Sequence, residues 1–265
     1  MSKEVNILIV AEGPKAERNF IEQLNKTFNI NFNVFCYGTN IYNLYKRMKE
    51  LDFNADLTQV LLELPEDPCI PDRKKLLNKK FAYTYLIFDF DAHHTEEYEK
   101  NASIDKIVSA NIQRLKEMTE HFTNETDPTI GKLYVNYPMM ESYRDADSLF
   151  DENFMSNYIS ISNIKNYKRI VGQKNLANKR IDSYTDKNFI SLASMNVHKL
   201  SKLMFDEWAP IDYSVYIEKS DSRCIIDAQE KSVVKNRSVC VLNTTLFLLI
   251  DYFGNQKGFY DKLFE

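Results

Sequence analysis

The chain has 265 residues, of which 44% are hydrophobic and 27% are charged, and its formal net charge is −4. This composition is ordinary for a globular protein, and 6 Gly and 7 Pro leave little room for long flexible linkers. A net charge this small does not attract nucleic acid by itself, so such binding would require a local basic patch.

The cysteines argue against a zinc site. Cys36, Cys69, Cys224 and Cys240 are far apart, and the chain has no CxxC pair. We therefore expect buried thiols in a reducing cytosol. The first residues lead directly into a strand pattern, which indicates no signal peptide. The most apolar late stretch, 239–250, falls short of the roughly 20 apolar residues that span a bilayer. The sequence thus predicts a cytoplasmic protein without a membrane segment.

Strand and helix patterns alternate through the first half of the chain. Residues 5–11 (VNILIVA) form a continuous apolar run, which is typical of a buried parallel strand. The further expected elements, in chain order, are a helix after Pro14, a strand over 33–37, a helix over 41–48, a helical piece over 55–63, a loop over 65–71, a strand over 83–90, a helix over 104–121 and a strand over 132–136. This alternation predicts a parallel sheet with helices on both faces.

After Pro138 strand patterns become scarce. We expect an α/β fold: a parallel sheet of about four strands flanked by helices over residues 1–148, followed by a mainly helical C-terminal region over 149–265. That region would pack on the first domain or beside it. Within it, residues 239–250 are expected to form a buried core helix.

Acidic residues follow three of the expected strands. Glu12 follows the first strand, Asp89 and Asp91 end the third, and Glu141 comes shortly after the fourth. Active sites of open α/β sheets form at the carboxyl ends of the strands, so we expect these side chains to converge. If the strand geometry persists to Asp91, Asp89 and Asp91 would share one face, and two neighbouring carboxylates favour a hard cation such as Mg²⁺ or Mn²⁺ between them.

This pattern resembles the Toprim domain, the catalytic domain of topoisomerases, bacterial primases and the OLD-family nucleases. The resemblance rests on Glu12-Gly13 after the first strand, a glycine after the second, and Asp89-x-Asp91 after the third. It covers about residues 5–145 and leaves the helical remainder outside.

Two further segments look most like the RloB and abortive-infection branch of that group. In the first, Glu12-Gly13 is followed by a second acid, Glu17, five positions after Glu12, and then by the aromatic Phe20. In the second, Pro138-x-x-Glu141 is similar to a segment of the same branch. Here the chain departs from the family, because Glu141 is expected on a turn or at a helix start and not on a strand.

The resemblance implies metal-dependent phosphodiester chemistry with one or two Mg²⁺ or Mn²⁺ ions. Glu12 would act as a metal ligand or general acid/base, and Asp89 and Asp91 would hold Mg²⁺. Glu17 and Glu141 match the acids that bind a second metal in OLD nucleases. Lys15, at the start of the first helix, is expected to stabilise the scissile phosphate or the leaving oxygen.

Residues 153–181 contain basic side chains and no acid. With Tyr158 and Tyr167 interleaved, the segment predicts binding of a nucleic-acid backbone with tyrosine stacking, and a solvated helix face is the alternative. The basic residues are Lys165, Lys168, Arg169, Lys174, Lys179 and Arg180. A second basic run, 73–80, is a weaker candidate for the same role.

Two histidines, His93 and His94, follow the aspartate pair directly. They could contact substrate or extend the metal shell, although loop histidines more often face solvent. His121 and His198 lie in helix patterns and are expected to be structural.

The leading hypothesis is therefore a metal-dependent nuclease that acts on nucleic acid in bacterial anti-phage defence. One alternative is a non-catalytic Toprim-fold subunit that binds nucleic acid or a partner ATPase. That ATPase would be a separate chain, because this one has no GxxxxGK phosphate loop. The other alternative is a phosphatase of the haloacid-dehalogenase type, although there the Asp-x-Asp pair ends the first strand of the fold.

Overall fold

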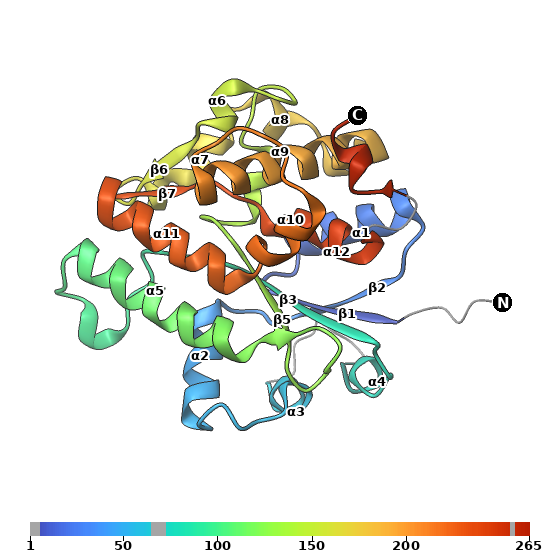
Figure 1. Cartoon of the computed structure of the whole chain (residues 1–265). Helices are drawn as coiled ribbons and strands as arrows, with labels where there is room; N and C mark the ends of the chain where they lie inside the picture. Colours follow the sequence, from blue (N-terminus) through green and yellow to red (C-terminus); the bar gives the residue numbers. More distant parts are fainter. Residues whose placement is uncertain (1–5, 65–72, 255–257) are drawn as a thin grey trace.

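A five-stranded sheet forms the centre of the protein (Figure 1), which a computed structural model describes over residues 6–64, 73–254 and 258–265. The strand order is β2-β1-β3-β5-β4. The parallel strands are β1 (Ile7–Ala11), β2 (Phe32–Cys36), β3 (Tyr83–Asp89) and β5 (Gly131–Asn136), and the short β4 (Thr123–Asn124) pairs antiparallel with β5. The predicted α/β class with a mainly parallel sheet is confirmed.

Helices cover both faces of this sheet, as expected for strands that are apolar on both sides. In Figure 1, α1 and α12 lie above the strands, and α2, α3 and α4 lie below them. The helices of the first half are α1 (Ala16–Phe28), α2 (Ile41–Glu50), α3 (Leu57–Leu62), α4 (Arg73–Leu77) and α5 (Ile104–His121). The predicted helix over 104–121 matches α5 at both ends.

The C-terminal half is mainly helical, as predicted, but it also contains a small antiparallel sheet. Its helices are α6 (Glu152–Met155), α7 (Tyr167–Val171), α8 (Asn175–Asn178), α9 (Asp186–Phe205), α10 (Tyr213–Lys219), α11 (Ser222–Asn236) and α12 (Phe247–Phe253). Strands β6 (Tyr158–Ser160) and β7 (Ser238–Cys240) form the sheet. Short 3-10 turns include η2 (Met140–Arg144), η3 (Ile164–Asn166), η4 (Ile181–Ser183) and η5 (Thr244–Leu246).

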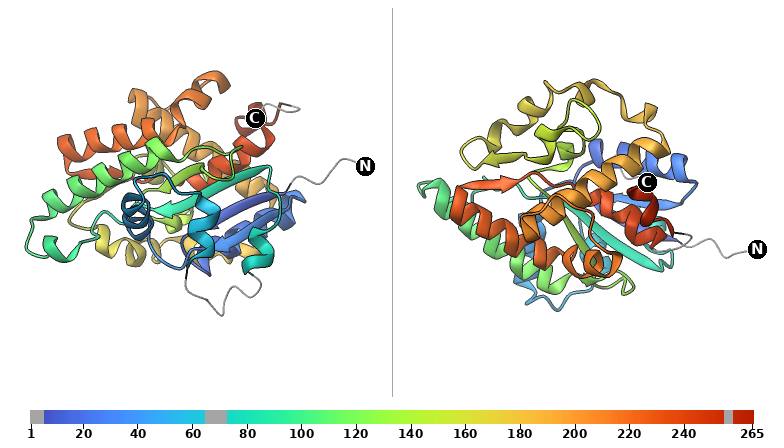
Figure 2. Two further views of the ribbon diagram at one scale, coloured as in Figure 1. Left: turned by 90° about the horizontal axis from the view of Figure 1, so that it is seen from below. Right: turned by 45° about the horizontal axis from the view of Figure 1, so that its top comes forward.

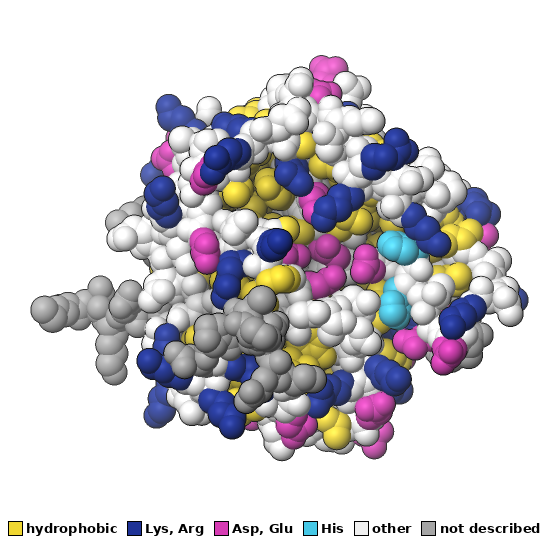
Figure 3. Space-filling view, turned by 180° about the vertical axis from the view of Figure 1, so that it is seen from behind, with side chains coloured by type: hydrophobic (Ala, Val, Ile, Leu, Met, Phe, Trp, Pro, Cys, Tyr) yellow, Lys and Arg dark blue, Asp and Glu magenta, His cyan; other side chains and the backbone are white. Residues whose placement is uncertain are grey.

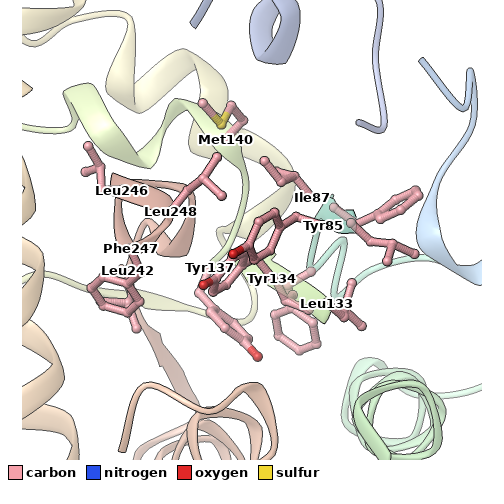
Figure 4. Close-up of a cluster of buried hydrophobic side chains, with 14 of the residues drawn as sticks. Tyr85, Ile87, Leu133, Tyr134, Tyr137, Met140, Leu242, Leu246, Phe247 and Leu248 are labelled. Atoms are coloured by element: carbon pink, nitrogen blue, oxygen red, sulfur yellow. The ribbon is translucent and has the colours of Figure 1, made fainter. Parts of the chain in front are cut away.

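The two halves share one hydrophobic core. Side chains of β3 and β5 pack against residues of η5 and α12 (Figure 4). Helices α5 and α11 run side by side in both views of Figure 2, and an ion pair at 2.6 Å joins Lys116 of α5 to Glu230 of α11. The faces of the sheet are therefore covered by helices from both halves of the sequence.

The prediction of one core helix over 239–250 is wrong in its first part. Residues 238–240 form β7, and Leu242 then pairs with Tyr137 through two backbone hydrogen bonds of 2.8 Å. Asn243 follows, with its side chain donating to the carbonyl of Met140 at 2.8 Å. The polar residues 243–245 thus satisfy buried groups next to β5. The 3-10 turn η5 begins at Thr244, and the α-helix α12 begins only at Phe247. The stretch is buried, as expected.

Other predictions concern the cysteines and the membrane. Cys36 and Cys240 are buried, and Cys224 is partly buried. Cys69 and the loop over 65–71 fall among residues 65–72, which lie outside the described ones. None of the helices in the described ranges is long and apolar enough to cross a membrane.

The direction of chain winding reverses between β1 and β3. The connection through α1 places β2 on one side of β1, and the connection through α2 to α4 places β3 on the other side. In doubly wound sheets, ligands bind at such a reversal, outside the carboxyl ends of the two strands. The reversal therefore marks where a site is to be sought.

We predict that Asn243→Ala lowers the free energy of unfolding by about 1–3 kcal/mol, because it leaves the buried carbonyl of Met140 without its donor. Urea denaturation measures this change. Asn178→Ala, at the exposed end of α8, serves as the control and should stay within about 0.5 kcal/mol of the parent chain. Equal stability of the two variants would contradict this role for Asn243.

Candidate functional site

Two carboxyl groups meet at the reversal between β1 and β3. Glu12 directly follows β1, and Asp89 is the last residue of β3. Because the two strands are neighbours in the sheet, the backbone N–H of Asp89 donates to Oε2 of Glu12 at 3.1 Å. The N–H of Glu12 in turn donates to the carbonyl of Ile87 at 3.1 Å. Backbone pairing thus fixes the position of both residues.

Glu12 lies in an environment that disfavours its charge. Burial raises the pKa of its carboxyl to about 8, helped by the negative charges of Asp91, Glu17 and Glu141. The N–H of Asp89 acts in the opposite direction but is outweighed. A carboxyl that would be ionised in water is therefore largely protonated at neutral pH in the absence of a cation.

Asp89 is buried more deeply than Glu12. Burial, followed by the charges of Glu12, Glu17 and two other acids, holds the pKa of Asp89 well above its usual range. Its Oδ1 atom is buried and has no hydrogen-bond partner. A buried acceptor without a donor is costly, and such an oxygen is available to a bound cation.

Asp91 does not continue the strand. Its φ is +35°, so the chain leaves the extended conformation directly after Phe90, whose side chain is buried. Asp tolerates this left-handed region better than most residues. The expectation that strand geometry persists from Asp89 to Asp91 is therefore wrong, yet Asp91 remains close enough to raise the pKa of Glu12. Burial raises the pKa of Asp91 itself, and His93 and His94 oppose that rise.

Glu17 and Glu141 bring two more carboxyls toward this cluster. Glu17, in the first turn of α1, is only 7% exposed, and burial raises its pKa. It packs against the backbone of Gly13, where a Cβ atom would lie 2.9 Å from Oε2 of Glu17. Glu141, on η2, is 5% exposed and adds its charge to the surroundings of Glu12, Glu17 and Asp89. The five predicted metal ligands therefore share one electrostatic environment.

A lysine from the C-terminal half reaches this cluster. The Nζ of Lys168, on α7, lies 2.5 Å from Oε1 of Glu141. The lysine side chain is 71% exposed while its partner is buried, so the cation approaches from solvent. This pair connects the predicted basic segment with the predicted acidic site.

The two histidines after the aspartates are partly buried. His94 stacks on Tyr42, with ring centroids 4.6 Å apart, and a ring nitrogen lies 3.4 Å from Oε1 of Glu96. Burial lowers the pKa of His93, which feels the charges of Asp91 and Lys165, and its Nδ1 is buried without a hydrogen-bond partner. Both histidines thus lie between full burial and full exposure, and their contact with substrate or metal stays a prediction.

Sequence reasoning missed Tyr42. Its side chain is fully buried, and its hydroxyl donates to the carbonyl of Phe90, between the two aspartates. Tyr42 comes from α2, 48 residues from Phe90, and in the sequence it looks like any apolar residue on a helix face. The residues around Tyr42 in the sequence do not indicate that its side chain would support the turn between Asp89 and Asp91.

Acidic side chains gather on one face of the molecule. Figure 3 shows acidic side chains at the centre of one side of the molecule, with histidines next to them and lysine and arginine around them. Within the described ranges, no three acidic, histidine or cysteine side chains already surround a common point as ligands would. The donors are nevertheless hard oxygens, and the free Oδ1 of Asp89 and the mutual repulsion of the acids fit a divalent cation of the Mg²⁺ or Mn²⁺ type.

The predicted basic residues differ in their surroundings. Lys168 lies at the acidic cluster, Lys165 is exposed near His93, and Arg169 is exposed on α7. The others have local partners: Lys174 lies 3.6 Å from Asp147, Lys179 donates to Asn188 at 3.1 Å, and Arg180 lies 2.5 Å from Asp182.

The expected tyrosine stacking fails for Tyr167. This side chain is buried, and its hydroxyl donates to Asp145 at 2.8 Å, so the ring is a core element and no base can stack on it. Tyr158 is partly buried in β6. Lys15 is exposed at the start of α1, and its expected role on a phosphate stays a prediction. Residues 73–77 of the second basic run form α4.

Comparisons with known proteins add no assignment: no protein-family model matches this chain, and neither the curated proteins nor the solved structures give a significant match. The functional interpretation therefore depends on the geometry of the site.

The raised pKa of Glu12 predicts how stability depends on pH. Between the unfolded value of 4.5 and the folded value of about 8, the folded chain holds a proton that the unfolded chain has lost. The metal-free protein should therefore lose stability as pH rises through this range. Glu12→Gln should make the loss smaller and raise the Tm at alkaline pH, by roughly 2–4 °C per kcal/mol of relieved repulsion. Thermal unfolding in EDTA at several pH values measures this.

Glu50→Gln is the matched control for this measurement. Glu50 lies exposed at the end of α2, away from the cluster, so its replacement should keep the pH dependence of the parent chain. If Glu12→Gln gave the same pH dependence as Glu50→Gln, the buried proton would not reside on Glu12.

Proposed function

We propose that this chain is a divalent-metal-dependent nuclease of the Toprim type, which hydrolyses phosphodiester bonds of nucleic acid. The observation that carries the proposal is the convergence of Glu12, Asp89 and Asp91 at the reversal of the sheet, without a matching number of cations. The short motifs resemble that domain, and the anti-phage defence role belongs to the same proposal.

The roles of the acids follow from their surroundings. Asp89 and Asp91, with Glu17 and Glu141, would hold one or two Mg²⁺ or Mn²⁺ ions through carboxylate oxygens. When bound, such an ion supplies Lewis-acid activation of the phosphate and a hydroxide nucleophile near neutral pH. Glu12, which lies beside Asp89, would act as a further metal ligand or as a general acid/base next to the reacting phosphate.

Basic residues around the cluster suit a polyanionic substrate. Lys168 contacts Glu141, and Lys165 lies near His93. The side chain of Lys168 is 71% exposed on the solvent side of Glu141, so its cation can also face a phosphate oxygen that arrives from solvent. The acidic cluster, with lysine side chains beside it, favours nucleic acid over a neutral or cationic substrate.

The proposal predicts nuclease activity that depends on Asp89. Incubation with plasmid, single-stranded DNA and RNA in Mg²⁺ or Mn²⁺ should give cleavage that EDTA stops. Asp89→Asn should reduce the rate by at least about a hundredfold, because it removes a ligand charge at the centre of the cluster.

The matched control is Asp52→Asn. Asp52 is exposed and has a φ of +49°, which asparagine tolerates equally well, so this variant should cleave like the parent chain. Cleavage that survives Asp89→Asn would reject the proposal. Absence of both cleavage and divalent-metal binding would favour a non-catalytic subunit that binds nucleic acid or a separate ATPase. Trapping of an aspartyl-phosphate would favour the phosphatase alternative.

A further inference from the structure

A groove leads away from the acidic cluster at Glu141. It consists of a cavity of about 240 Å³ lined by Glu141 and Arg144, and an adjoining cavity of about 490 Å³ along α1. Asn19, Arg180 and Ile181 line both cavities, so the two lie side by side along α1. One wall is α1, and the other is the segment over 177–182 at the end of the basic region.

Cations dominate the part of the groove nearest the site. Arg144, Lys179 and Arg180 line the smaller cavity, whose one acidic residue in the described lining is Glu141. Lys168 already faces that acid at 2.5 Å. The path therefore changes from acidic at the cluster to basic within one cavity.

Two of these cations are held in place by buried aromatic rings. The guanidinium of Arg144 lies 5.9 Å from the ring of Tyr143, and Nζ of Lys179 lies 5.1 Å from the ring of Tyr184. The two tyrosine rings pack edge to face, with centroids 6.1 Å apart. Because the rings are buried, they support the cations and cannot stack on bases. Recognition in this groove would thus concern the phosphate backbone and not the base sequence.

The size of the two cavities favours a single strand over a duplex. Cavities of roughly 300–1,000 Å³ hold ligands of drug size. The cavity of about 490 Å³ lies in this range and the one of about 240 Å³ lies below it, so each fits only a small part of one strand. A duplex presents two backbones separated by a groove about 12 Å wide, and its bulk cannot enter such cavities.

We propose, resting on the nuclease function above, that this groove binds the backbone of a single strand and carries it to Glu141. The substrate class is then single-stranded nucleic acid, or a single-stranded end of a duplex, without sequence preference. Arg144, Lys179 and Arg180 contact successive phosphates. The exposed Arg180–Asp182 ion pair is weak and opens when a phosphate arrives.

A second basic cavity, of about 630 Å³, provides the comparison. It lies at the end of α9 against α11, and its lining includes Lys231 and Lys235, both exposed. None of the five predicted metal ligands lines it. It therefore offers cations of the same kind in a space of similar size, away from the proposed site.

The test measures binding without cleavage. Fluorescence anisotropy in EDTA compares a labelled 20-nucleotide oligo(dT) strand with a 20-base-pair duplex. We expect the single strand to bind more tightly by roughly tenfold or more. Lys179→Gln/Arg180→Gln should weaken binding by roughly tenfold and reduce the slope of log K against log salt by about 1.4, since each lost phosphate contact removes about 0.7.

Lys231→Gln/Lys235→Gln is the matched control and should leave both quantities unchanged. Arg180→Gln alone, at a side chain that is 83% exposed, gives half of the slope change should the double variant not fold. Equal binding of duplex and single strand, or an equal loss in the control, would overturn the proposal.

Failure of this inference differs from failure of the nuclease proposal. If the groove binds a single strand in EDTA but no substrate is cleaved with metal, the single-strand inference is supported and the nuclease proposal is rejected. If duplex is cleaved while Lys179→Gln/Arg180→Gln binds like the parent chain, the nuclease proposal is supported and the single-strand inference is rejected.

Discussion

The reversal of winding between β1 and β3 is the constraint on which the site depends. It makes the strand that ends before Glu12 and the strand that ends at Asp89 direct neighbours, and a backbone hydrogen bond of 3.1 Å then joins the two residues. Two carboxyls in a buried position repel each other, and Glu17 and Glu141 add to that repulsion. The fold therefore concentrates negative charge at the place where doubly wound sheets bind their ligands.

The C-terminal half completes this site and does not simply flank it. Asn243 binds the carbonyl of Met140 and so holds the start of η2, the turn that carries Glu141. Thr245 donates to the side chain of Asn136, the last residue of β5. Lys168 then neutralises Glu141 from the opposite side. Each of these contacts spans many residues of sequence, so the two halves cannot be separated without disturbing the acidic cluster.

Local patterns predicted the sheet and its acidic ends, because buried parallel strands are continuous apolar runs and the chain position of an acid after a strand is visible in the sequence. What could not be predicted depends on distant partners. The support of the Asp89–Asp91 turn by Tyr42, the burial of Tyr167 against Asp145, and the contact of Lys168 with Glu141 arise only in three dimensions. Residues 238–240 look helical by apolar content, yet pairing with β6 makes them a strand. Tertiary pairing overrides local propensity at such places.

Other carboxyl groups in this protein have a structural role and differ from Asp89 in their partners. Glu99 lies 2.6 Å from Arg114, both side chains nearly buried, and although burial opposes it, hydrogen bonds from that arginine lower the pKa of Glu99. Asp251 likewise pairs with Lys132 at 2.7 Å. The Oδ1 atom of Asp89 is buried too, but it has no donor and the pKa of Asp89 is raised. Glu99 and Asp251 each have a cation beside them, whereas Asp89 shares its surroundings with four other acids. Unpaired acids at the carboxyl edge of the sheet destabilise the metal-free fold, and such a cost is characteristic of groups kept for binding or chemistry.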